Sequence, residues 1–82
     1  MQPDLHESIV DLGLALVRRR GVHHRILREG YTAAVAEADR ESQCDFGRAL
    51  GGVYRAFGVS DDVFEDALEV ADQFERWAGV KR

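Results

Sequence analysis

Several residue types are scarce in this 82-residue sequence, and each shortage excludes a class of structure. Pro3 is the only proline, and no stretch alternates apolar with polar residues, so β-strands are not expected. Cys44 is the only cysteine, which excludes an intramolecular disulfide and a zinc site built from several thiolates. No apolar run approaches the roughly 20 residues of a transmembrane helix, and the first residues do not resemble a secretory signal. We therefore expect a soluble, cytoplasmic protein.

The chain is also short, and its 11 basic residues are outnumbered by 15 acidic ones. The formal net charge is −4, which disfavours long-range attraction of the whole molecule to nucleic acid. Residues 1–82 are predicted to form a single helical domain, and the core of so short a chain supplies only about 3–5 kcal/mol. Burial of an apolar face against a second copy is one source of further stability. We therefore expect a homo-oligomer and favour a dimer.

Apolar residues recur at spacings of three and four, which is typical of amphipathic helices. The sequence thus predicts an all-α fold, a compact bundle of four short helices, or five if the second is broken. The predicted ranges are about 4–20, 22–40, 43–57 and 60–78. Gly21 is expected to end the first helix, and Gly30 to kink or break the second, with Thr32 as a cap in the latter case. Ser42 and Asp45 resemble a capping box that starts the third.

Residues 18–28, here called the basic segment, are the local exception to the negative charge. Arg18, Arg19 and Arg20 are interpreted as cations that complement the dipole at the end of the first helix. The others have no such explanation, and two alternatives stay open: pairing with the acidic face of the last helix, or binding of phosphate groups. The candidate anion or nucleic-acid contacts are Arg18, Arg19, Arg20, His23, His24, Arg25 and Arg28.

A second candidate surface combines glycines with aromatic residues. Gly47 and Gly51 lie four residues apart in a predicted helix, where glycine is destabilising unless another backbone passes close by. Trp77 ends the widest apolar face, and aromatic residues with a polar atom are enriched at interfaces. The predicted association surface consists of Gly47, Gly51, Tyr54, Phe74 and Trp77.

Patterns for catalysis, cofactors and metals are missing. No histidine has a glutamate three residues before it, and no glycine-rich phosphate loop is present. Cys44 is predicted to be a small packed residue. The sequence therefore predicts a non-enzymatic protein-interaction or regulatory protein that self-associates, without a cofactor, a metal or a membrane partner. Two alternatives are a DNA-binding regulator that uses the basic segment, and an acidic inhibitor that mimics nucleic acid with the carboxylates of residues 61–75.

Overall fold

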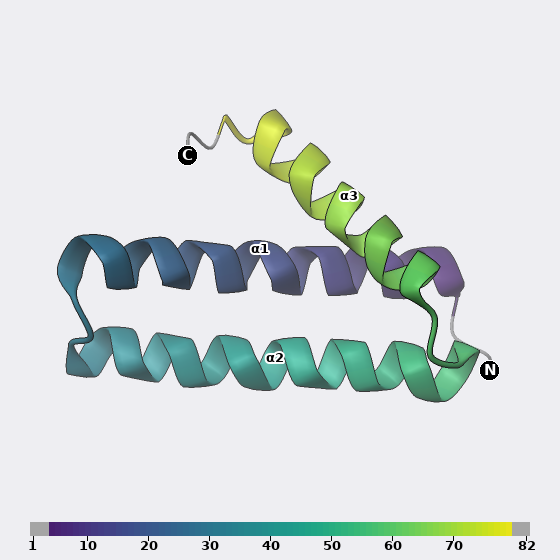
Figure 1. The fold of residues 1–82 in the computed structure, drawn as a ribbon, viewed down its shortest axis with the longest axis horizontal. Helices are drawn as coiled ribbons and strands as arrows, with labels where there is room; N and C mark the ends of the chain where they lie inside the picture. Colours follow the sequence, from purple (N-terminus) through teal and green to yellow (C-terminus); the bar gives the residue numbers. More distant parts are fainter. Residues whose placement is uncertain (1–3, 80–82) are drawn as a thin grey trace.

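Three helices make up the part of the chain, residues 4–79, that the computed structural model describes. Helix α1 spans Leu5–Glu29, α2 spans Ala33–Phe57 and α3 spans Asp61–Trp77. Helices α1 and α2 form a long antiparallel hairpin, and α3 runs obliquely across one face of it, along α1 (Figure 1). The predicted all-α class is confirmed. The predicted number of four or five helices is wrong.

The observed helix ends follow from capping side chains and from glycines. The Asp4 carboxylate accepts hydrogen bonds from the amides of His6 and Glu7, at 2.8 and 3.3 Å, and so begins α1. Gly30 ends α1 with a φ of +79°, a conformation in which a Cβ is strained. The Thr32 hydroxyl then accepts from the Val35 amide at 3.2 Å and begins α2. Of the two alternatives predicted around Gly30, the structure shows the break.

Two predicted helix boundaries do not exist, and their absence reduces the count to three. Helix α1 continues through Gly21 because Val22, on the far side of the glycine, is buried. Ser42 does not cap a helix: it is buried inside α2 and its hydroxyl donates to the Asp39 carbonyl oxygen at 3.0 Å. Residues 22–29 therefore belong to α1, and the predicted helix at 43–57 is the second half of α2.

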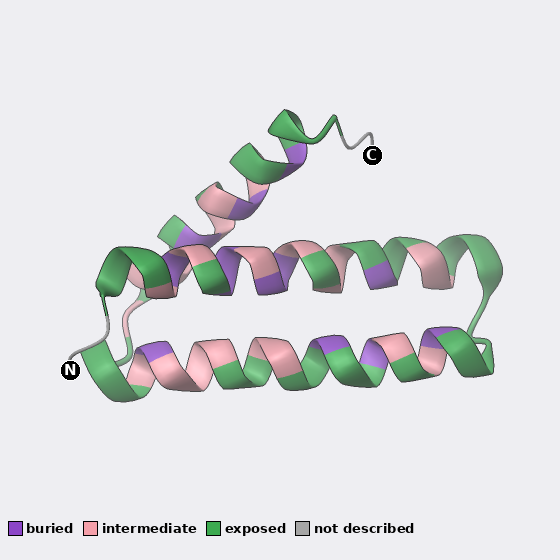
Figure 2. Cartoon of the chain, turned by 180° about the vertical axis from the view of Figure 1, so that it is seen from behind, coloured by how far each residue is buried: buried purple, intermediate pink, exposed green. Residues whose placement is uncertain are grey.

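The core lies where the first half of α1 meets the end of α2 and the length of α3 (Figure 2). Its buried apolar members come from all three helices: Ile9, Leu12, Leu16, Val53, Ala67 and Ala71. Gly13 lies where α3 crosses α1, and a Cβ at this position would be 2.7 Å from Val70 Cγ1 and 3.0 Å from the Ala67 carbonyl oxygen. The two helices therefore approach each other closely because Gly13 has no side chain.

Helix α1 is the common partner of the other two. Both α2 and α3 pack against it, whereas the backbones of α2 and α3 are not in close contact with each other within the described residues. The C-terminal end of α3 points away from α2 (Figure 1), while Ala71 and Glu75 of its second half stay buried and Arg20 of α1 pairs with Glu75. Within residues 4–79, no helix is both long and apolar enough to cross a membrane.

Candidate interaction surfaces

The basic segment lies in the interior of α1. Arg20 precedes the end of the helix at Glu29 by about two and a half turns, whereas the favourable effect of a cation on the dipole falls off within the last turn. The interpretation of Arg18, Arg19 and Arg20 as dipole-compensating residues is therefore wrong. Successive helical residues point about 100° apart, so these three side chains reach three different neighbours.

Arg19 holds a polar cluster at the loop end of the hairpin. Its guanidinium donates to the Asp39 carboxylate, to the Asp39 carbonyl oxygen at 3.2 Å and to the Ser42 hydroxyl at 2.9 Å. The Tyr31 hydroxyl donates to the other Asp39 carboxylate oxygen at 3.1 Å, and His23 Nε2 lies 3.0 Å from Arg19 Nη2. The hydrogen bond from Arg19 lowers the pKa of Asp39, and the hydrogen bond to Asp39 raises the pKa of Tyr31.

Acidification is expected to weaken this cluster. Because the pKa of Asp39 in the folded protein lies below its ordinary value of 3.8, its stabilising contribution is complete above that value and is lost as the pH falls through the lowered one. Urea unfolding between about pH 7 and about pH 2 should show a smaller loss of unfolding free energy for Asp39→Asn than for the unmodified chain. Asp66→Asn, at an exposed carboxylate, is the control. An equal loss in all three proteins contradicts this expectation.

Arg18 and Arg20, the neighbours of Arg19, tie α1 to both other helices. Arg18 pairs with Asp45 of α2 at 3.2 Å, in an exposed position. Arg20 reaches α3 on the other face and donates to Asp72 and Glu75, each at 2.8 Å. The Glu75 side chain is only 8% exposed, and its hydrogen bond is the main reason why the pKa of Arg20 is raised. These contacts establish that part of the basic segment pairs with the acidic face of the last helix.

The remaining residues of the basic segment do not form one surface with these three. Arg25 pairs with Glu29 of its own helix at 3.0 Å. His24 and Arg28 are exposed, and neither has a hydrogen bond or ion pair within residues 4–79. Pairing with the last helix was one of two alternatives for His23, His24, Arg25 and Arg28, but the residue that makes it is Arg20.

The structure divides the predicted association surface into two groups. Gly47, Gly51 and Tyr54 lie on α2, whereas Phe74 and Trp77 lie at the end of α3 that diverges from α2 (Figure 1). No atom lies within 4 Å of a Cβ at Gly47, and the nearest atoms at Gly51 belong to Arg55 of the same helix. The close backbone approach expected at these glycines is thus not made within the described residues. It occurs at Gly13, which the sequence reasoning did not single out.

The aromatic group is the more exposed of the two. The Phe74 and Trp77 rings are tilted by 46° with centroids 5.8 Å apart, and Trp77 is 83% exposed. Cys44, predicted to be packed, is exposed on α2. No cluster of three or more histidine, cysteine or carboxylate side chains suitable for a metal ion is found among residues 4–79.

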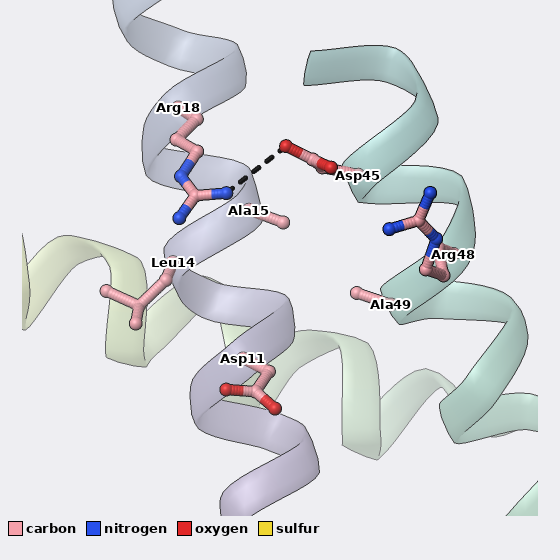
Figure 3. A pocket seen from close by; sticks show the side chains of 7 residues that line it. All are labelled: Asp11, Leu14, Ala15, Arg18, Asp45, Arg48 and Ala49. Carbon is pink, nitrogen blue, oxygen red and sulfur yellow. Dashed lines mark hydrogen bonds and ion pairs between the residues drawn. The ribbon is translucent and has the colours of Figure 1, made fainter. Parts of the chain in front are cut away.

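A groove between α1 and α2 is a feature that the sequence reasoning missed. It is called the hairpin groove here and consists of three hollows of about 410, 350 and 230 Å³, which share residues where they meet. Residues 8–28 of α1 and 38–53 of α2 line it. Figure 3 shows the middle hollow, with Ala15 and Ala49 between the walls and with Asp11, Arg18, Asp45 and Arg48 around them.

The signal for this groove is present in the sequence as a spacing. Small residues line the hollows from both α1 and α2, and charged residues recur beside them at intervals of three, four or seven. The small residues lining the hollows are Ala15, Gly21, Ala38, Ala49 and Gly52. The pattern is recognisable only once residues 33–57 are known to form one uninterrupted helix.

Comparison with known proteins adds no assignment to these surfaces. No protein family model, no curated protein and no solved structure matches this chain.

Proposed function

We propose that this chain is a small non-enzymatic interaction protein that self-associates. The observation that carries the proposal is the exposed aromatic pair of Phe74 and Trp77 near the C-terminal end of α3. Tryptophan is among the residues that contribute most binding energy at protein interfaces. The open surface of α2 around Gly47 and Gly51 supports the same reading, because a partner backbone can approach closely there.

The contacts of the basic segment favour this reading over a polyanion site. Arg18, Arg19, Arg20 and Arg25 all pair with carboxylates of the same chain, so binding a phosphate with them exchanges existing ion pairs for new ones. The DNA-binding regulator and the acidic nucleic-acid mimic stay predictions. A titration with duplex DNA tests the first, since binding through these arginines requires an affinity that falls steeply with salt.

Two substitutions test the proposed association by sedimentation equilibrium. Trp77→Ala is expected to raise the dissociation constant of the dimer roughly tenfold, because it removes a large aromatic contact. Gly51→Leu is expected to weaken the dimer by blocking close approach, while within the chain the Cβ that it adds meets only the flexible end of Arg55. Leu27→Ala is the matched control, since Leu27 is an exposed apolar residue outside the association surface.

The effects of these three substitutions on the dimer distinguish between the possible outcomes. A dimer that dissociates more readily in the first two variants and not in Leu27→Ala supports the proposal. A protein that stays monomeric at all concentrations contradicts self-association.

A further inference from the structure

The hairpin groove lies on the face of α1 and α2 opposite to α3. Gly13 faces Ala67 and Val70 of α3, whereas Asp11 and Arg18, which lie on another side of α1, line the groove. Figures 1 and 2 show the hairpin from its two sides: α3 crosses one side, and the other is left open by the described residues. In Figure 3 α3 passes behind the hairpin while the hollow opens toward the viewer. A whole face of the longest helices is thus uncovered.

The charges along this face follow a diagonal pattern. On the α1 wall, Asp11 lies toward the N-terminal end, and Arg25 and Arg28 lie toward the loop. On the α2 wall the order of signs is reversed, with Glu41 toward the loop and Arg48 toward the other end. These charges mark four corners of the groove: Asp11, Arg25 with Arg28, Glu41 and Arg48. Each corner has a neighbour of opposite sign across the groove and another along the same helix.

Such a pattern is complementary to itself. A two-fold axis in the plane of the face, either along the helices or across them, places each corner over a corner of opposite sign in a second copy. A polyanion is not complementary to this pattern. It would be attracted by the arginines and repelled by the carboxylates of Asp11, Glu41 and Asp45. The small residues at Ala15 and Ala49 leave room for side chains of an opposing helix.

From this complementarity we infer that a second copy of the chain docks on the hairpin groove, so that two hairpins form a four-helix arrangement with α3 on each outer face. The inference rests on the proposed self-association and adds a second interface to it, separate from the one proposed at Phe74 and Trp77, which lie on α3. With the axis along the helices, Arg48 faces Asp11 of the other copy. With the axis across the helices, Arg48 faces Glu41 of the other copy.

Charge reversal tests this arrangement by sedimentation equilibrium at low salt. Arg48, Asp11 and Glu41 are exposed and have no hydrogen bond or ion pair with other described residues, so we expect their substitution to leave the fold intact. Arg48→Glu is expected to raise the dimer dissociation constant about tenfold, because two-fold symmetry applies each lost attraction twice. Arg40→Glu, on α2 but outside the hairpin groove, makes the same change in net charge and is expected to have little effect.

A second reversal identifies the axis. Restoration of the dimer by Asp11→Arg in the Arg48→Glu background supports the axis along the helices, and restoration by Glu41→Arg supports the axis across them. A dimer that is indifferent to Arg48→Glu, or one that neither second change restores, overturns the inference. If Trp77→Ala weakens that dimer nonetheless, the proposed function stands without this surface, whereas the absence of any dimer contradicts the proposed function itself.

Discussion

Replacing Gly13 with alanine is expected to lower the free energy of unfolding by about 2 kcal/mol, the middle of the range for forcing extra atoms into a packed interface. Intrinsic helix propensity favours the alanine by about 1 kcal/mol, so propensity alone predicts the opposite result. Packing prevails because the added Cβ lies 2.7 Å from Val70 Cγ1 and 3.0 Å from the carbonyl oxygen of Ala67. The second atom belongs to the backbone, and α3 has to move as a whole to make room.

Urea unfolding followed by circular dichroism measures this effect. Gly21→Ala is the matched control, because it is the same change in the same helix at a site with no atom within 4 Å of the new Cβ. It is expected to stabilise the protein by about 0.5–1 kcal/mol through helix propensity. If Gly13→Ala stabilises the protein as much as Gly21→Ala does, the close crossing of α1 and α3 is contradicted.

Replacing Arg20 with alanine is expected to cost about 2 kcal/mol, since hydrogen bonds to charged groups contribute more than neutral ones. Arg20 donates to both Asp72 and Glu75. Among the described residues, it is the member of the basic segment that contacts α3. The Glu75 carboxylate is nearly buried, so it cannot exchange the guanidinium for water without a change in the packing of α3. The loss should therefore appear as partial release of the second half of α3.

Thermal unfolding and the fluorescence of Trp77 report this release together. A loss of about 2 kcal/mol lowers the melting temperature of so small a domain by roughly 10 °C. Arg28→Ala is the matched control, because Arg28 is an exposed cation of the same helix without an ion pair within residues 4–79. Equal melting temperatures for the two variants contradict a role for Arg20 in holding α3.

The helix ends show how far the sequence determines this fold. Gly21 and Gly30 are both glycines within helical patterns, and local rules assign a helix end to either. Gly30 ends α1 because it adopts a positive φ and Thr32 is placed to cap the next helix. Gly21 stays helical because Val22 is buried beyond it, which is a tertiary contact that no local pattern records. The all-α class follows from periodicity, whereas the helix count depends on such contacts.

The candidate surfaces show the same division. Pairing between the basic segment and the acidic helix was one alternative that the sequence left open, but for other residues than Arg20, which makes it in the structure. The partners of Arg18 and Arg19, Asp45 and Asp39, were not predictable, because local patterns place helix ends between these arginines and the carboxylates. The hairpin groove was missed for a related reason: its α2 wall runs through Ser42, where a helix boundary was expected.

The position of α1 between its two partners bears on how freely each helix can change in sequence. Helix α1 presents one side to α2 and another to α3, so a substitution on either of these two sides affects an interface. The backbone of α3 lies close to α1 only, and its other side exposes Glu65, Glu69 and Gln73. Sequence drift is therefore tolerated most on the outer sides of α2 and α3, where new surface chemistry can arise without disturbing the fold.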